Sequence, residues 1–213
     1  VASPGGGSDF TARRIAQGIA GPLGQSVIVD YRGASLLSLE YVLKSPPDGY
    51  TLYVTGSTLW VVPLLRKSPY DAERDFSPIT LTDMSPSIVA VHPSLPVKSI
   101  KELIALATAK PGELNYGASS PGSPAFFAGE SLKAMTGIKM LNVHYKASGQ
   151  GVTALVSGEV QLSITDAVLI MPHVKSGRLR GLAVASEQPS ALAPGMPTAT
   201  ASGLAGFEAG GRT

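Results

Sequence analysis

The sequence has 213 residues, of which 44% are hydrophobic, with 24 glycines and 17 prolines, enough for one large domain or two small ones. The formal net charge is only +2 and the basic residues are scattered, so the basic stripe typical of a nucleic-acid-binding surface is missing. The lack of Cys excludes disulfides, thiolate catalysis and Cys-ligated metals, and no apolar run reaches the ~18 residues of a membrane span.

Short apolar runs alternate with helical patterns, as in an α/β protein whose strands are connected by helices. Ser99–Glu102 has the sequence of a capping box, and Ser123 places a capping hydroxyl ahead of a proline at the first helical position. In chain order the patterns predict helix Phe10–Ile19, strand Val27–Asp30, helix Leu36–Lys44, strands Thr51–Thr55 and Ile88–His92, helices Ile100–Ala107 and Phe126–Met135, strand Leu141–His144, helix Val152–Val156, strand Leu162–Thr165, helix Val168–Lys175 and strand Gly181–Ala185.

The prolines at 93 and 96 interrupt this pattern and mark the most plausible domain boundary. We therefore expect a first αβ lobe over residues 1–93, a second over 97–186, and a crossover back with a tail over 187–213. Each lobe is expected to contain a mainly parallel sheet flanked by helices. The tail Gly206–Thr213 is small and polar and shows no closing helix or strand.

Four loops rich in glycine and hydroxyl groups are expected at strand ends: Pro4–Asp9, Thr55–Thr58, Tyr116–Pro124 and Thr165–Asp166. Glycine lets the backbone approach a ligand, and a helix that starts there offers unpaired N–H groups and a positive dipole end. Each loop alone has an ordinary alternative as a turn or cap. Since ligands of open α/β sheets bind at the carboxyl ends of strands, the four together favour a shared cleft for an anion.

Single polar residues carry weaker signals. His92, His144 and His173 are far apart and lack metal-ligand spacing, so structural or surface roles are expected and no metal site is predicted. Asp9 has two interpretations: it stabilises the first turn of a helix, which we favour, or it binds a ligand amine.

An enzyme remains the alternative hypothesis. Ala118–Gly122 resembles the G-x-S-x-G elbow of α/β serine hydrolases, with Ser120 as nucleophile followed by Asp166 and His173 in that fold's order. However, Pro121 lacks the N–H that the oxyanion hole requires, and Asp166 and His173 are expected at opposite ends of one helix. A binding protein without catalysis is therefore favoured.

A series of short motifs, in the same order along almost the whole chain, resembles the Bug family, the periplasmic solute-binding proteins of tripartite tricarboxylate transporters. The motifs are Pro4–Asp9, Pro47–Leu52, Pro69–Asp71, Asp75–Ile79, Leu114–Gly117, Ala128–Glu130, His144–Lys146, Pro172–Gly177 and Pro197–Thr198. Most are weak individually, but their combination and order are specific.

The resemblance implies a two-lobed, Venus-flytrap-like periplasmic protein without a cofactor, which captures a small carboxylate in an interdomain cleft. Family ligands include dicarboxylates, tricarboxylates, amino acids and aromatic acids, and the partners are the membrane components of the transporter. No signal peptide is recognised at the start of this chain. In the family, two loops hold the ligand carboxylate between them, and a strand end selects the far end of the ligand. The matching positions here, together with a third loop, give the expected binding residues: Gly6, Gly7, Ser8, Ser57, Thr58, Ser119, Ser120, Gly122, Ser123, Thr165 and Asp166.

This sequence departs from the family pattern at three places. Arg32–Ser38 is shorter than the family's glycine-rich stretch and contains leucines, and Phe126 stands where many members have His. The family chain continues well beyond Glu208, so we expect truncation at the C-terminus and an incomplete first lobe.

Overall fold

The structure is a computed structural model that describes residues 4–5, 7–33, 35–65, 67–82, 84–119 and 121–212. The chain divides into two compact units: unit 1 comprises residues 1–84 with 212–213, and unit 2 comprises residues 85–211. The sequence analysis expected two lobes that enclose a solute between them, and this remains a prediction.

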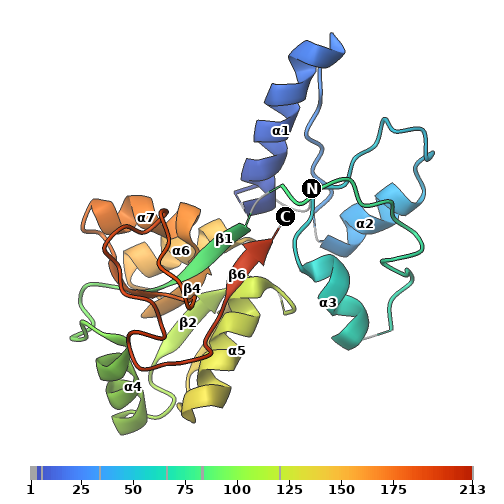
Figure 1. The fold of residues 1–213 in the computed structure, drawn as a ribbon. Helices are drawn as coiled ribbons and strands as arrows, with labels where there is room; N and C mark the ends of the chain where they lie inside the picture. Colours follow the sequence, from blue (N-terminus) through green and yellow to red (C-terminus); the bar gives the residue numbers. More distant parts are fainter. Residues whose placement is uncertain are drawn as a thin grey trace. The chain divides into compact units, whose positions relative to one another are not determined.

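Unit 1 contains the helices α1 (Gly7–Leu23), α2 (Ser35–Leu43) and α3 (Thr58–Leu65), shown in blue to cyan in Figure 1. Its core is small and consists of Leu39, Leu59 and Tyr70, with Tyr53 and Phe76 packed against it. The Tyr70 hydroxyl donates a hydrogen bond of 2.9 Å to the Leu59 carbonyl, so the ring also fixes the start of α3.

Two strand predictions in unit 1 are wrong, because neither Val27–Asp30 nor Thr51–Thr55 forms a strand in the described chain. A strand exists only where its backbone groups pair with a neighbouring strand, and local sequence preference does not supply that partner. Helix α3 was missed because Val61, Val62 and Pro63 disfavour a helix locally, although Pro63 lies inside it.

Unit 2 is built around one sheet with the strand order β3-β2-β4-β1-β5, and β6 also pairs with β1. Apart from β2 and β6, which have no counterpart among the predicted strands, its helices and strands lie within a few residues of the predicted ones. They are β1 (Met84–Val91), α4 (Ile100–Ala109), β2 (Asn115–Ala118), α5 (Pro124–Thr136), β3 (Leu141–His144), α6 (Ser148–Ser157), β4 (Leu162–Asp166), α7 (Ala167–Lys175), β5 (Arg180–Val184) and β6 (Gly210–Arg212).

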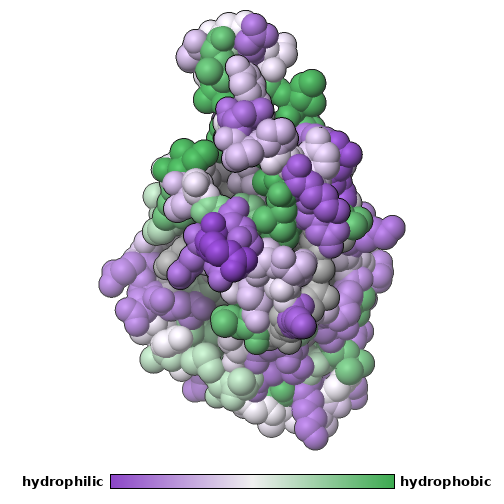
Figure 2. All heavy atoms as spheres, turned by 90° about the vertical axis from the view of Figure 1, so that its right-hand side faces the viewer, coloured by the Kyte–Doolittle hydropathy of each residue, from purple (hydrophilic) through white to green (hydrophobic). Residues whose placement is uncertain are grey.

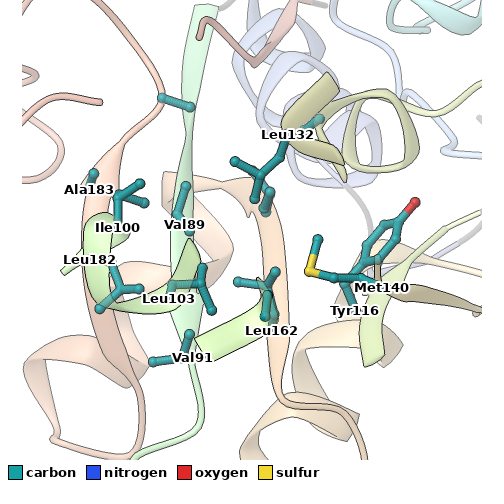
Figure 3. Close-up of a cluster of buried hydrophobic side chains, with 14 of the residues drawn as sticks. Val89, Val91, Ile100, Leu103, Tyr116, Leu132, Met140, Leu162, Leu182 and Ala183 are labelled. Carbon is teal, nitrogen blue, oxygen red and sulfur yellow. The ribbon is translucent and has the colours of Figure 1, made fainter. Parts of the chain in front are cut away.

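The sheet of unit 2 is covered by helices on both faces, with α4 and α5 on one and α6 and α7 on the other (Figure 1). Successive residues of β1 alternate between the two cores: Val89 and Val91 belong to the first, and Ile88 and Ala90 to the second. Figure 3 shows the first core, in which Ile100 and Leu103 of α4 and Leu132 of α5 surround side chains of the sheet.

The predicted mainly parallel sheet has one exception, β1, which pairs antiparallel with both β4 and β5, whereas β2 pairs parallel with β3 and β4. The tail also differs from prediction, because Gly210–Arg212 forms the strand β6 beside β1. A Cβ atom on Gly210 would lie 2.7 Å from the Ser85 carbonyl oxygen, so glycine allows this close approach.

Most of the exposed large hydrophobic side chains belong to residues 1–84, including Tyr50 (94% exposed), Ile28 (85%) and Leu64 (83%). Figure 2 shows one face of the molecule, where hydrophobic side chains are interspersed with polar ones. Within the described chain, no helix has both the length and the apolarity needed to cross a membrane.

Candidate functional site

Three neighbouring strands of unit 2 end at the same edge of the sheet. Strands β3, β2 and β4 are adjacent and parallel, and they lead into α6, α5 and α7, respectively. Each helix N-terminus carries unpaired N–H groups and about half a positive charge from the helix dipole. The positive ends of three helices of unit 2 therefore lie at this edge of one sheet.

The loop between β2 and α5 is shaped by glycine and closed by a serine cap. Gly122 is buried and has a φ of +89°, a conformation that favours glycine. Ser123 is only 6% exposed, and its Oγ accepts a 3.2 Å hydrogen bond from the Phe126 N–H, with Pro124 at the start of α5. The cap predicted for Ser123 is confirmed.

The first residue of this loop is held from the neighbouring strand β3 and helix α6. The Ser148 hydroxyl donates to Ser119 Oγ at 3.4 Å, and His144 Nδ1 lies 3.5 Å from the Ser119 carbonyl oxygen. The Tyr145 N–H donates to the Ala118 carbonyl at 2.9 Å. The loop Ser119–Ser123 is thus anchored at both ends, while Ser120 between them lies outside the described residues.

The third predicted element of the site, the end of β4, lies next to β1 and β6. Thr165 is 3% exposed and opposes Ile88 in the sheet, whereas Asp166 opposes Ser87 and is half-buried. Asp166 occupies the N-cap position of α7 but makes no side-chain cap bond there. A Cβ on Gly211 would lie 2.7 Å from Asp166 Oδ1, so β6 runs close to this carboxylate.

In unit 1, the predicted binding residues again lie at helix N-termini. Gly7 and Ser8 form the first turn of α1, and Gly6 lies outside the described residues. The Ser57 carbonyl accepts the Trp60 and Val61 N–H groups at the start of α3, and the Thr58 side chain is outside the described part. The structure therefore brings Gly7 and Ser8 together and, in unit 2, places Ser119, Gly122 and Ser123 in one loop.

Asp9 has a structural role, as the sequence analysis favoured. Its carboxylate accepts hydrogen bonds from the Gly5 N–H at 2.7 Å, Arg13 Nε at 2.8 Å and the Tyr31 hydroxyl at 2.5 Å. Burial alone would raise the pKa of Asp9, but the bonds from Tyr31, Gly5 and Arg13 outweigh it and lower that pKa. The contact with Tyr31 was missed because the two residues are 22 positions apart.

The segment Arg32–Ser38, where the sequence departs from the family pattern, leads into α2, which begins at Ser35. Arg32 pairs with Asp30 at 2.6 Å, and its guanidinium carbon lies 4.0 Å from the centre of the Tyr41 ring. Ser38 is buried and Leu37 is exposed. Arg32 is therefore held by local charge contacts, and Ser38 is buried within α2.

The alternative hydrolase site gains no support from this geometry. Asp166 precedes α7 and His173 lies in its last turn, so seven residues, or about 10 Å at 1.5 Å per residue, separate them. His173 Nδ1 is buried without a hydrogen-bond partner among the described groups, and burial lowers the pKa of this imidazole. Ser120 lies outside the described residues.

Two neighbours of the loop were not predicted to belong to a site. Ser148 follows a predicted strand and opens the small-residue run Ser148–Gly151, a signal similar to that of the other loops. His144 was expected to be a surface or structural residue, and it is exposed, with its ring stacked on Phe126 at a centroid distance of 6.1 Å. Across the described residues, no cluster of three or more His, Cys, Asp or Glu side chains could hold a metal ion.

Comparison with known protein families gives one match over most of the chain. The family profile described as the tripartite tricarboxylate transporter family receptor matches residues 11–211. A UPF0065 protein of Bordetella bronchiseptica is 36% identical over 204 residues, which cover 93% of this chain and 60% of that protein. Protein BugT of Bordetella pertussis is 32% identical over 211 residues, which cover 97% of this chain and 65% of BugT. The chain thus spans 60–65% of the length of these curated relatives.

Solved structures agree with this match. The R. palustris protein Rpa4515 with adipate has a TM-score of 0.94 and 33% sequence identity, with 100% of this chain and 73% of that chain covered. The periplasmic binding protein BugD has a TM-score of 0.92 and 26% identity, with 99% and 71% covered. The similarity confirms the predicted α/β fold of the periplasmic-binding-protein type.

Proposed function

Since the chain belongs to the tripartite tricarboxylate transporter receptor family, we propose that it captures a small carboxylate solute for the membrane components of such a transporter. The protein acts by binding rather than by catalysis, and its place of action is the periplasm. The relative BugD, described as a periplasmic binding protein, supports this location.

The observation that carries the proposal is the edge of unit 2 where α5, α6 and α7 begin beside one another. A carboxylate at a helix N-terminus gains from the dipole and from N–H donors. Hydrogen bonds to a charged acceptor are roughly twice as strong as neutral ones, so an anion can be held without an arginine. Rpa4515, which is 33% identical, was solved with the dicarboxylate adipate, and this also supports the proposal.

We propose that Ser123 is the side chain that contributes most to carboxylate binding. A hydroxyl group can accept two hydrogen bonds and donate one. Its Oγ already accepts the Phe126 N–H, which fixes the oxygen and leaves the proton to be donated. We assign Gly122 and Ser119 to the same loop site, with Thr165 and Asp166 selecting the far end of the solute.

The residues Gly6, Gly7, Ser8, Ser57 and Thr58 in the loops of unit 1 are also proposed as carboxylate donors. Support comes from their position, since Gly7 and Ser8 begin α1 and Ser57 directly precedes α3. The backbone N–H groups of Gly7 and Ser8 are therefore among those that a helix leaves without an internal partner.

The experiment compares Ser123→Ala with Ser99→Ala in calorimetric titrations with adipate and other small carboxylates. Both serines are N-caps: Ser99 Oγ accepts the Glu102 N–H at 3.2 Å, and the Lys98 N–H donates to Glu102 at 2.7 Å, confirming the predicted capping box. Each variant loses a cap worth about 1 kcal/mol. Because β1 is antiparallel to β4, α4 begins at the opposite edge of the sheet, so Ser99 is a matched control.

We expect Ser123→Ala to weaken carboxylate binding by about 10-fold or more, as for a lost hydrogen bond to a charged group, and Ser99→Ala to leave it unchanged. Equal affinities of the two variants for every carboxylate would remove Ser123 from the site.

A further inference from the structure

Two residues with aromatic side chains lie at the two ends of the proposed carboxylate loop of unit 2, and their rings stack on each other. His144, at the end of β3, lies 3.5 Å from the carbonyl of Ser119, the first residue of the loop. Phe126, in the first turn of α5, donates its N–H to Ser123, the last residue of the loop. The two rings stack with a centroid distance of 6.1 Å and an interplanar angle of 30°.

The two rings differ in their support and exposure. Phe126 is half-buried and packs against the hydrophobic core, and it also meets Phe127 edge-on at 5.6 Å. His144 is exposed, so its ring is supported from one side and open to solvent. With the Phe126 ring on one side and the Ser119 carbonyl 3.5 Å from Nδ1, the imidazole offers a flat, exposed surface beside the loop.

We propose that the His144–Phe126 pair is a specificity-determining wall that stacks on the planar body of an aromatic carboxylate whose carboxylate group binds the adjoining loop. This inference rests on the proposed function, because the loop must first bind a carboxylate. Phe126 supports the His144 ring, and His144 makes the contact with the solute.

Stacking explains why this wall discriminates among acids. Offset aromatic pairs contribute beyond their buried area, by an amount equivalent to about 3- to 10-fold in affinity. A short hydroxylated acid gains no such contact and loses water from its hydroxyl groups beside an apolar ring. The expected order of affinity is therefore benzoate above cyclohexanecarboxylate, and cyclohexanecarboxylate above malate.

If the His144–Phe126 pair only supported the loop, its removal would change carboxylate affinities in a different way. If the two rings only hold the loop in place, their removal weakens all carboxylates by the same factor. If they form the wall, their removal lowers affinity for the aromatic acid alone. The ratio of two affinities in one variant therefore separates the two roles.

The test titrates the full chain and the variants His144→Asn and Phe126→Leu with benzoate, cyclohexanecarboxylate, malate and succinate. Asn keeps a side-chain amide near the Ser119 carbonyl, and Leu keeps an apolar group on the core. Phe127→Leu is the matched control, because it removes the neighbouring ring on the same helix. Circular dichroism melting curves establish that each variant is folded.

We expect His144→Asn and Phe126→Leu to lose about 3- to 10-fold in benzoate affinity while succinate stays within twofold, and Phe127→Leu to change neither. Equal losses for benzoate and succinate, or no preference for benzoate in the original chain, would overturn the wall and leave the proposed function intact. Absence of binding by every carboxylate would overturn both.

Discussion

At the residue scale, Asp9 is the clearest case of a charged side chain whose partners determine its role. It is 6% exposed and accepts bonds from Gly5, Arg13 and Tyr31, which hold its pKa below the ordinary value although burial alone would raise it. A carboxyl whose pKa is lowered by folding adds stability above its unfolded pKa of about 3.9, and that stability is lost as the pH falls through the folded pKa.

We therefore predict that Asp9→Asn lowers the free energy of unfolding at pH 7 by about 1–2 kcal/mol and flattens its decline in acid. Urea unfolding between pH 7 and pH 2 measures both effects. The control is Asp48→Asn, since Asp48 is exposed and accepts one turn bond from the Tyr50 N–H at 3.0 Å. Parallel pH profiles for the original chain and Asp9→Asn would contradict this role.

A second residue-scale prediction concerns Gly129, where α5 crosses Tyr116. A Cβ at this position would lie 2.1 Å from Tyr116 Cε2. The tyrosine is fully buried, and its hydroxyl donates to Glu130 at 2.6 Å, so the ring has little freedom to move. Burial and the bond to Glu130 raise the pKa of Tyr116, which keeps the hydroxyl protonated.

Gly129→Ala should lower the free energy of unfolding by about 1–3 kcal/mol, because overpacking outweighs the better helix propensity of alanine. The matched control is Gly151→Ala in α6, where the nearest atom to the added Cβ would be 3.5 Å away. That variant should be neutral or slightly stabilising. A stabilising effect of Gly129→Ala in urea unfolding would contradict the close approach of α5 and Tyr116.

Sequence reasoning at this scale worked where the interaction is local. Ser99 and Ser123 were predicted as caps because each bonds the N–H three residues on, and both bonds are present. The Tyr31–Asp9 contact was missed because its residues are 22 positions apart, and the His144–Phe126 contact because its residues are 18 positions apart. Only the fold brings such pairs together.

At the element scale, unit 2 followed its sequence pattern and unit 1 did not. Helices α4 to α7 and strands β1 and β3 to β5 lie within a few residues of their predicted positions, because buried runs and helical periodicity agree there. Val27–Asp30 and Thr51–Thr55 have strand-like composition but no strand assignment. Strand β6 shows the converse, since its two glycines fit against Ser85 and Asp166 where larger residues would clash.

The connection between β1 and α4 gives a prediction at this scale. Arg180 of β5 donates from Nη1 to the carbonyls of Leu95 at 3.0 Å and Val97 at 2.8 Å. The proline-containing segment 93–97 is therefore attached to the sheet by a charge-assisted pair of bonds. Arg180→Met removes both bonds: the Val97 carbonyl loses this donor, whereas the Leu95 carbonyl keeps the Val97 N–H at 2.8 Å.

We expect Arg180→Met to cost about 1–3 kcal/mol and to speed amide hydrogen exchange in residues 93–99. Arg178→Met is the control, because Arg178 is exposed and bonds only the neighbouring Ser176 hydroxyl in the described structure. Unchanged exchange in this segment after Arg180→Met would show that the two bonds do not hold it.

At the scale of the whole molecule, the two units have different internal support. Unit 2 has two hydrophobic cores, one on each face of its sheet, whereas the core of unit 1 centres on Leu39, Leu59 and Tyr70. The order of family motifs, rather than any single motif, identified the family from sequence. The solute is set by side chains that meet only after folding, so its identity was beyond local pattern.

The central claim is that the chain binds carboxylates, and a thermal-shift screen tests it most directly. The purified chain is melted with small carboxylates, including adipate, benzoate and succinate, and with the corresponding amides as matched controls. A ligand at 100 times its dissociation constant adds about 2.7 kcal/mol, or about 5–10 °C for a chain of this size. We predict a shift with at least one carboxylate and none with its amide. A cooperative melt that no carboxylate shifts, or equal shifts by acid and amide, would contradict the claim.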